Sequence, residues 1–525
     1  MGQLFEAELS LTGLECADSV QLYTDGIPNP ATCREPERDN KLIFRHGDRQ
    51  CVVNFPDGYC LDVPADWQVD FSLSPVRIRY TGPYCVLNVT CEKIIYDSRE
   101  FFFQECFDRH MKDPGFWKAN RITETRPCHT ETVGEYTAEF QHLRLDAMPE
   151  GALSHYTYVK LYNDSPYFYF FLFKSSGEED IEPVIRSFRP IPVEGTAVYS
   201  KKFEVKIPSH WTKETRACYD RLCSRTDTPW GIYCADLLHK GMDETMPRLE
   251  AEMEDRFELV SQYVHYSHDF TLELARKVHD SGRLFQMSYQ YTTSNNTHLE
   301  GYTPVLDIYR GECDEVLRNY ARQIKAYGEP MLFRLNNEMN TDWTSYCGLV
   351  NMLDPDIFIE TWVRLYRIFE EEGVDNCIWI FNPSGDSFPP CRWADFINYM
   401  PPSEYVQMMG VTAYCPGHGG FDSYEKLYAK IEDDYRPFFM DWPWIISEFG
   451  CGPDDGTKIE EQARWIRECF DCMAQRRFPN IKAAIWFSAN DYNPDGSVHN
   501  GYQLNPDIPQ VMAAFREGFQ KIHHT

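Results

Sequence analysis

Positive charge and long apolar stretches are both scarce in this chain of 525 residues. Its 51 Lys and Arg residues stand against 81 Asp and Glu, which gives a formal net charge of −30. Nucleic acids and anionic membrane surfaces bind proteins through a concentrated positive field, so this balance argues against both. No stretch approaches the roughly 20 uninterrupted apolar residues that a membrane-spanning helix requires. We therefore expect neither a nucleic-acid partner nor insertion into a membrane.

Signals for export are missing as well. The first residues, Met-Gly-Gln-Leu-Phe-Glu, carry an acidic side chain where a signal peptide has basic ones, and no apolar run follows. The 19 cysteines are odd in number and spread along the whole length. That distribution favours reduced, buried thiols in a reducing compartment. Together these features predict a cytoplasmic protein.

Motifs for cofactor chemistry are also lacking. The chain has no Walker motif, no Gly-rich dinucleotide loop and no Gly-x-Ser-x-Gly nucleophile elbow. His265 and His268 lie close in sequence, but no nearby Cys or carboxylate pair completes a zinc site. Cys469 and Cys472 form a lone Cys-x-x-Cys, which we interpret as coincidental without a second pair. We expect no metal and no cofactor.

Aromatic residues, in contrast, are abundant. They make up 15% of the chain, within a composition of 43% hydrophobic and 25% charged residues that is typical of a soluble protein with a core. Aromatic rings pack well against the apolar faces of sugars. The negative charge repels polyanions, so a neutral glycan suits this protein better than a uronic acid polymer. Composition therefore favours an uncharged carbohydrate as the partner.

The first part of the chain, residues 1–195, is predicted to be an α+β domain built on an antiparallel sheet. It consists mostly of short runs of β-formers, and residues 157–173 predict a hairpin around an Asn-Asp-Ser-Pro turn. Two helical stretches, at 99–111 and 180–188, interrupt the strands. The polar residues 196–228 are predicted to be a linker.

From residue 229 to 525 the pattern changes to short strands alternating with amphipathic helices. Eight strands are predicted, at 231–234, 260–266, 284–291, 331–335, 377–381, 406–414, 444–449 and 483–487. This number of strands in about 300 residues is typical of a (β/α)8 barrel. A doubly wound open sheet gives a similar alternation, but its Gly-rich phosphate loop is missing. The sequence thus predicts an α/β fold, a TIM barrel preceded by the α+β domain.

Two of the predicted barrel strands end in a glutamate. Glu338 follows the fourth strand and Glu448 ends the seventh, so the two side chains should face each other across the barrel mouth, where TIM barrels hold their active sites. Retaining cleavage of a glycosidic bond requires two such carboxyl groups at a separation of roughly 5–5.5 Å. One must stay protonated to act as the acid, and the other must be ionised to attack the sugar.

The surroundings of these glutamates resemble clan A of the glycoside hydrolases, most closely family 26, the β-mannanase and β-glucanase type. The match is strongest in Arg334-Leu-Asn-Asn-Glu-Met-Asn-Thr-Asp-Trp343, which is similar to the family pattern Arg-x-x-His-Glu-Met-Asn-Gly-x-Trp. The resemblance covers a little over half of the chain and leaves the N-terminal domain unexplained. It implies that Glu338 is the acid/base and Glu448 the nucleophile.

The chain departs from the family pattern at Asn337, where the family has His. Asn is the commoner choice across the clan and reaches the 2-hydroxyl of the sugar, so gluco-configured substrates stay open beside mannan. The resemblance also implies that Tyr414 donates a hydrogen bond to Glu448. Arg334 lies four residues before Glu338, and strand alternation places it beneath the two carboxyl groups.

Two tryptophans are candidate sugar platforms. Trp486, at the end of the eighth strand, is predicted to stack under the sugar at the cleavage site, with barrel filling as the alternative. Trp343 follows the acid/base loop and is predicted to support the leaving-group sugar, with packing on the loop as its alternative.

The leading hypothesis is a retaining glycoside hydrolase that cleaves β-linked oligo- or polysaccharide of the mannan or β-glucan type. One alternative keeps the same residues in an exo-acting enzyme for β-glucosidic or β-xylosidic bonds. Another, from a different class, is a non-catalytic carbohydrate-binding barrel protein. The presence of both glutamates favours an enzyme.

Overall fold

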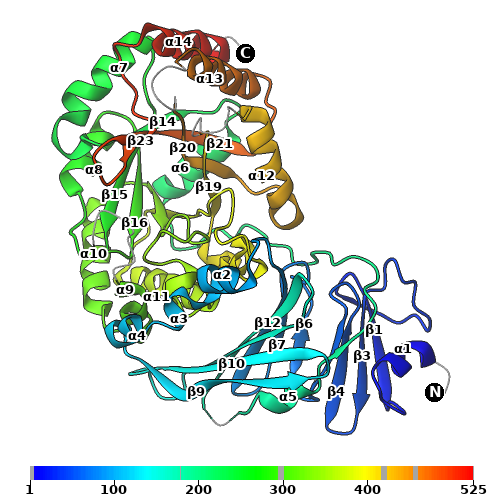
Figure 1. Ribbon diagram of the computed structural model, residues 1–525. Coiled ribbons are helices and arrows are strands. Elements are labelled where there is room, and N and C mark those ends of the chain that lie inside the picture. The colour runs from blue at the N-terminus through cyan, green and yellow to red at the C-terminus, as the bar shows by residue number, and fades with distance from the viewer. Residues whose placement is uncertain (1–4, 178, 294–300, 416–421, 453–458, 524–525) are drawn as a thin grey trace.

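The computed structural model describes residues 5–177, 179–293, 301–415, 422–452 and 459–523. Two antiparallel sheets come first in the chain, and a closed eight-stranded barrel follows them (Figure 1). The predicted fold class is therefore confirmed. Among the described residues, no helix has both the length and the apolar character needed to cross a membrane.

The smaller N-terminal sheet has six strands in the order β13-β5-β4-β3-β1-β2. Its strands are β1 (Ser19–Thr24), β2 (Ile27–Asn29), β3 (Lys41–His46), β4 (Arg49–Asn54), β5 (Tyr59–Pro64) and β13 (Arg189–Pro190). One face packs against helix α1 (Glu6–Leu11) and the residues beside it. The other face packs against the larger sheet through residues such as Val52 and Leu61.

The larger sheet has seven strands in the order β6-β7-β8-β12-β11-β10-β9. They are β6 (Gln68–Asp70), β7 (Ile78–Thr81), β8 (Cys85–Lys93), β9 (Ile122–Val133), β10 (Tyr136–Leu145), β11 (His155–Tyr162) and β12 (Tyr167–Ser175). The predicted hairpin corresponds to β11 and β12. The predicted helical stretches correspond to α2 (Arg99–Phe103), η1 (Gln104–Asp108), α3 (Arg109–Met111) and α5 (Glu182–Arg186).

Both faces of the larger sheet are covered, which explains why its central strands are apolar throughout. In β12 every residue after Tyr167 is buried, as in a strand with packing on both sides. Phe171 and Phe173 face the smaller sheet, whereas Phe168, Phe170 and Leu172 join the hydrophobic core that continues into the barrel. The sheet therefore links the N-terminal region to the barrel through one continuous core.

The barrel closes by pairing its last strand with its first, and all pairs are parallel. Its strands are β14 (Trp230–Cys234), β15 (Leu259–His265), β16 (Leu284–Gln290), β17 (Met331–Leu335), β18 (Cys377–Phe381), β19 (Met408–Cys415), β20 (Trp444–Cys451) and β21 (Ile481–Ser488). Each overlaps a predicted strand.

Helices surround the barrel except after β18. They are η2 (Leu237–Thr245) with α7 (Met246–Met253), α8 (Leu272–Asp280), α9 (Pro304–Arg310), α10 (Asp314–Tyr327), α11 (Pro355–Glu372), α12 (Tyr424–Phe439), α13 (Ile459–Ala474) and α14 (Pro509–His523). Residues 382–407, all described, carry only the short turns η4 (Arg392–Ala394), η5 (Phe396–Tyr399) and η6 (Ser403–Tyr405). The larger N-terminal sheet and α2 lie on this side of the barrel (Figure 1).

The segment predicted as a linker, 196–228, is more than a connector. It contains helix α6 (Lys213–Ser224), whose Cys218, Tyr219 and Leu222 pack against inward-facing residues of the barrel strands such as Leu259. The helix thus covers the N-terminal end of the barrel. Sequence analysis missed it because polar residues surround its short apolar stripe. The proposed boundaries of the two domains stay a prediction.

Candidate active site

The candidate site lies at the C-terminal ends of the barrel strands. On most barrel strands the inward-facing residues change from apolar at the α6 end to polar further up. On β17, Leu332 joins the apolar layer above α6, and Arg334, two residues later, is completely buried beneath the mouth. This order follows from the period of two in a strand. The polar residues at the mouth therefore lie directly above a layer of apolar side chains, the apolar floor of the barrel.

The loop after β17 presents Glu338 through an unusual backbone. Asn336 and Glu338 both have positive φ, 47° and 59°, in the left-handed region that non-glycine residues rarely adopt. Neighbouring strands fix this conformation. The Asn336 N–H donates to Tyr289 O at 2.8 Å, and the Glu338 N–H donates to Asn382 O at 2.8 Å. Such strain persists where the surroundings determine it, and it is frequent at functional sites.

Glu448 is aimed into the barrel by an irregularity in β20. The pairing with β19 shifts register between Val411 and Thr412, so that Thr412 pairs with Glu448 instead of Ser447. A bulge of this kind changes the face on which the following side chains lie. Phe449 then packs outward against Trp486, and the carboxyl group of Glu448 lies within the mouth.

Three donors hold the carboxyl group of Glu448. Arg334 Nη1 donates to Oε2 at 3.0 Å, the Tyr263 hydroxyl donates to the same oxygen, and the Tyr414 hydroxyl donates to Oε1 at 2.5 Å. Arg334 is itself fixed by a bond from Nε to Ser288 Oγ of 2.7 Å. Hydrogen bonds and a neighbouring cation stabilise the ionised form of a carboxyl group. Glu448 thus has hydrogen-bond donors on both carboxyl oxygens, one of them the cation Arg334.

Glu338 has a different environment. From the residues that the structure describes, its Oε2 accepts only long hydrogen bonds, from Asn337 Nδ2 at 3.3 Å and from Trp343 Nε1 at 3.4 Å. Burial, and then the negative charge of Glu448, raise the pKa of Glu338 to about 8. Its carboxyl group is thus protonated at neutral pH, while Glu448 is surrounded by donors. The two groups have the opposite surroundings that an acid and a nucleophile need.

Asn337 is buried beside Glu338 and is held in one orientation. Its Oδ1 accepts hydrogen bonds from Gln290 Nε2 at 3.0 Å and from the Tyr346 hydroxyl at 3.4 Å. Gln290 also donates to the Tyr346 hydroxyl at 3.1 Å. Because Oδ1 is occupied, the amide group of Asn337 faces Glu338 with its donor side.

The two predicted tryptophan platforms have different outcomes in the structure. Trp343 is 39% exposed and lies next to Phe388, with ring centroids 5.3 Å apart, so its ring is accessible beside Glu338. Trp486 is completely buried, and its Nε1 donates to Tyr502 O at 2.9 Å. Its ring contacts Phe449 and Phe515 on the outside of the barrel.

The prediction that Trp486 stacks under the sugar is therefore wrong, because Trp486 lies one residue away from the inward-facing positions of β21. Ile485 belongs to the inward layer above α6, so Trp486 points outward and Phe487 points inward again. Phe487 is half-buried and contacts Tyr233, Tyr263 and Tyr414 at centroid distances of 5.0, 6.2 and 6.0 Å. Phe487, not Trp486, is the aromatic ring at the mouth.

Sequence analysis also missed Tyr263 as a partner of Glu448. A signal was present, because Leu259, Ser261, Tyr263 and His265 alternate along β15 and Leu259 belongs to the apolar floor. Counting every second residue from the apolar layer toward the C-terminal end of the strand identifies Tyr263 on β15 and Phe487 on β21 as inward-facing residues. The bulge before Glu448 gives no comparable signal in the sequence.

The N-terminal region supports the loop that carries Glu338. Tyr158 of β11 donates its hydroxyl hydrogen to Met352 O at 2.9 Å, and Lys174 Nζ of β12 lies 2.9 Å from Asp354 and 2.7 Å from Asp356. Asp354 in turn caps α11 by accepting the Asp356 N–H at 3.1 Å. The start of α11 is thus fixed from the N-terminal sheet.

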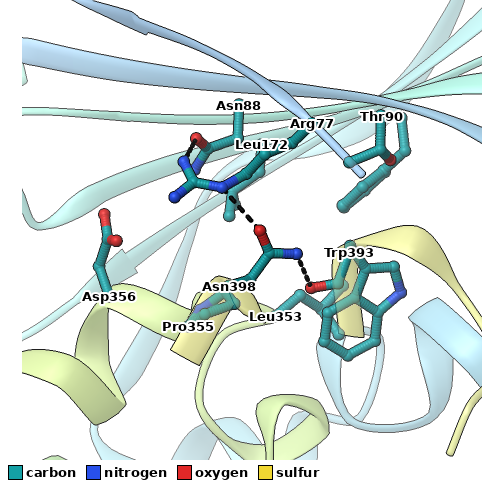
Figure 2. A pocket seen from close by; sticks show the side chains of 10 residues that line it. Arg77, Asn88, Thr90, Leu172, Leu353, Pro355, Asp356, Trp393 and Asn398 are labelled. Carbon is teal, nitrogen blue, oxygen red and sulfur yellow. Dashed lines mark hydrogen bonds between the residues drawn. The ribbon is translucent and has the colours of Figure 1, made fainter. Parts of the chain in front are cut away.

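A second contact between the two regions surrounds a small cavity (Figure 2). Arg77 donates to Asn398 Oδ1 at 2.7 Å and to Asn88 Oδ1 at 2.8 Å, and Asn398 donates to Trp393 O at 3.2 Å. The cavity holds about 20 Å³, which is too little for a sugar ring. It belongs to the interface and not to the substrate site.

Comparison with known proteins agrees with the resemblance. Residues 286–438 match the model of glycosyl hydrolase family 26. The match extends well beyond the motif around Glu338 and confirms the predicted resemblance. The matched segment includes Arg334, Asn337, Glu338, Trp343 and Tyr414, and it ends before Glu448. The matched family is one of glycosyl hydrolases.

The individual relatives have low sequence identity to this chain. Endoglucanase H of Acetivibrio thermocellus is 23% identical over 273 residues, which are 50% of this chain and 27% of the relative. A mannan endo-1,4-beta-mannosidase of Bacillus subtilis is 29% identical over 114 residues, 20% of this chain and 29% of the relative. This chain thus spans less than a third of the length of these relatives.

Among solved structures, the catalytic domain of the GH26 endo-beta-1,4-mannanase of Bacillus sp. JAMB-750 is similar with a TM-score of 0.44. The two are 12% identical, and the match covers 61% of this chain and 93% of the other.

Proposed function

We propose that this protein is a retaining glycoside hydrolase that cleaves neutral β-linked glycans, with Glu338 as the acid/base and Glu448 as the nucleophile. The observation that carries the proposal is the unequal environment of the two carboxyl groups. Glu448 accepts hydrogen bonds from Arg334, Tyr263 and Tyr414, whereas burial and the charge of Glu448 raise the pKa of Glu338 to about 8.

In the first step, a carboxylate oxygen of Glu448 attacks the anomeric carbon and the bond to the leaving oxygen breaks. Glu338 gives its proton to that oxygen, so the leaving sugar departs as a neutral alcohol. Glu338 is now ionised and takes a proton from water. The water oxygen attacks the anomeric carbon, releases Glu448 as a carboxylate and returns Glu338 to its protonated form.

The aromatic rings on either side of the carboxyl groups supply surfaces for sugars. Phe487 lies with Tyr233 and Tyr414 near Glu448 and suits the sugar that becomes attached to the enzyme. Trp343 and Phe388, both partly exposed, adjoin Glu338 and suit the leaving sugar. Asn337 orients its amide toward the same place and provides a donor for a sugar hydroxyl.

The substrate class follows from the names of the relatives and from the charge. An endoglucanase and two mannan endo-1,4-beta-mannosidases are among the proteins with matching sequence. The net charge of −30 disfavours anionic polysaccharides. We therefore infer neutral β-glucan or mannan chains, or the oligosaccharides derived from them, as substrates. The predicted cytoplasmic location favours the oligosaccharides.

The test is hydrolysis of β-linked manno-, gluco- and xylo-oligosaccharides, with NMR detection of the anomer released first. We expect a β-product from one sugar series and loss of turnover in both Glu338→Gln and Glu448→Gln. Glu329→Gln is the matched control, because Glu329 is an exposed glutamate just before β17 at the opposite end of the barrel. An α-product, or full turnover in Glu448→Gln, would contradict the mechanism.

A further inference from the structure

Two histidines and a glutamate meet in the N-terminal region, far in sequence from the carboxyl pair. His129 lies on β9, His142 on the neighbouring strand β10, and Glu182 is the first residue of α5. One ligand atom from each lies within 4.8 Å of the others. Helix α5 lies beside β9 and β10, on the side of the larger sheet that is remote from the barrel (Figure 1).

Three of the four imidazole nitrogens in this cluster are buried and available. Neither ring nitrogen of His129, and not Nε2 of His142, has a hydrogen-bond partner among the residues that the structure describes. A buried polar atom without a partner is costly, and coordination of a metal ion is one way to satisfy it. At neutral pH an imidazole is largely unprotonated and presents the lone pair that a metal ion needs.

The spacing of the two rings agrees with a shared ion. Their centroids lie 5.5 Å apart. Two imidazoles bound to one tetrahedral zinc ion at about 2.0–2.1 Å have centroids about 5 Å apart. His129 Nε2 lies 4.0 Å from Glu182 Oε1, so a shift of less than an ångström per side chain closes that pair around an ion.

Neighbouring groups hold the rings in place. The Thr157 hydroxyl lies 3.1 Å from Nδ1 of His142, which leaves Nε2 as the free ligand atom. A polar partner on the second ring nitrogen is typical of metal-binding histidines. The ring of His129 stacks on Phe140 at a centroid distance of 4.9 Å and a tilt of 9°. Both rings therefore have neighbours that limit their rotation, and because the two ring planes are nearly parallel, at 6°, binding of an ion requires a small rotation of one ring.

Two arginines compete with the ion for Glu182. Arg126 donates to Oε1, and Arg186 Nη2 donates to Oε2 at 2.7 Å. The Arg126 side chain is half exposed, so it can move into water at little expense, as exposed ion pairs contribute little stability. Arg186 can remain on Oε2 as an outer partner. Arg126 is the group that an ion must displace.

We propose that His129, His142 and Glu182 bind one zinc-like divalent ion, with water as the fourth ligand. Two imidazoles and one carboxylate suit Zn²⁺ or Co²⁺, and they are too few oxygens for Ca²⁺ or Mg²⁺. The ion fastens α5 to the outer hairpin of β9 and β10. The local sequence search missed this cluster because its ligands are separated by 13 and 40 residues and meet only in the folded sheet.

The proposal is tested by adding Co²⁺ to the purified full chain and recording absorption and binding heat. We expect one equivalent of Co²⁺ with the visible d–d bands of a four-coordinate ion and without the strong near-ultraviolet band of cobalt bound to thiolate. His142→Ala should lower the affinity by about 100-fold or more, since loss of a mere outer partner costs about 10- to 100-fold. His279→Ala, at an exposed histidine of α8, should leave the affinity unchanged.

Arg126→Ala gives the sharpest outcome. Removal of the competing cation should tighten Co²⁺ binding, whereas a nonspecific surface site would not respond. Glu182→Gln, which preserves the shape of the side chain, provides a second ligand variant, and a melting curve of each metal-free variant checks that it folds. Full affinity in both His142→Ala and Glu182→Gln, or a thiolate band that grows with the bound cobalt, would overturn the proposal.

Discussion

The behaviour of the proposed enzyme above neutral pH depends on Glu338. Burial and the charge of Glu448 raise its pKa to about 8. At pH 7 about nine in ten Glu338 carboxyls then carry a proton, compared with about one in three hundred for an ordinary glutamate. We therefore expect kcat/KM to fall as the pH rises through 8, by about tenfold per pH unit beyond it, because the leaving oxygen loses its proton donor.

Glu338→Gln removes the titrating group and keeps the shape of the side chain. We expect kcat/KM on oligosaccharides to fall by about 10²- to 10⁴-fold, the usual contribution of a positioned acid, and the alkaline decline to disappear. An aryl glycoside with a 2,4-dinitrophenolate leaving group needs no proton, so its first step should slow far less. A variant that retains the alkaline decline near pH 8 would refute the assignment of that decline to Glu338.

The same raised pKa predicts a change in stability. Between the ordinary pKa of 4.5 and about 8, folded Glu338 keeps a proton that the unfolded chain releases. Its contribution to stability is fully present below pH 4.5 and is lost as the pH rises through 8. Glu338→Gln lacks this loss, so the variant should gain stability relative to the wild type by up to about 1.4 kcal/mol per pH unit in this interval.

Thermal unfolding of the two proteins, followed by tryptophan fluorescence at pH 5, 7 and 9, measures that difference. The Tm of Glu338→Gln minus that of the wild type should increase steadily from the lowest to the highest pH. A difference that does not change with pH would refute the raised pKa and, with it, the role of burial in keeping Glu338 protonated.

Three further predictions follow from single contacts. Tyr263→Phe removes one charge-assisted hydrogen bond from the carboxyl group of Glu448, worth about 1.5–3 kcal/mol, so kcat should fall by roughly 10- to 100-fold with little change in Tm. Lys174→Met leaves the buried carboxylate of Asp354 without its cation, and urea unfolding should show a loss of about 3–5 kcal/mol; an unchanged midpoint would contradict the role of this pair. Phe487→Ala should raise KM, whereas Trp486→Phe should lower Tm and leave KM unchanged, and the reverse pattern would restore Trp486 as the platform.

The sequence predicted those features that depend on periodicity and on local motifs. The eight strands have the residue types of β-structure, and the Asn337-Glu338 motif lies at a strand end, so both were visible. The side-chain direction of Trp486 could not be read from the sequence, because a register error of one residue reverses the face of a strand. The bulge that turns Glu448 inward depends on pairing with β19, which no local pattern encodes.

The N-terminal region was the least predictable part, and the structure suggests why it accompanies this barrel. The loop from Asn336 to Asp354 has little regular structure and is mostly buried, so its polar groups must find partners elsewhere. The sheet supplies them through Tyr158 and Lys174. The same sheet covers residues 382–407, the segment that follows β18. The other strands of the barrel are followed by a helix in the corresponding place. The strained conformation of Glu338 thus depends on a fixed loop, and that loop depends on the sheet. Removing the sheet would expose the buried ends of both loops, so the N-terminal region is part of the structure that positions Glu338, the proposed acid.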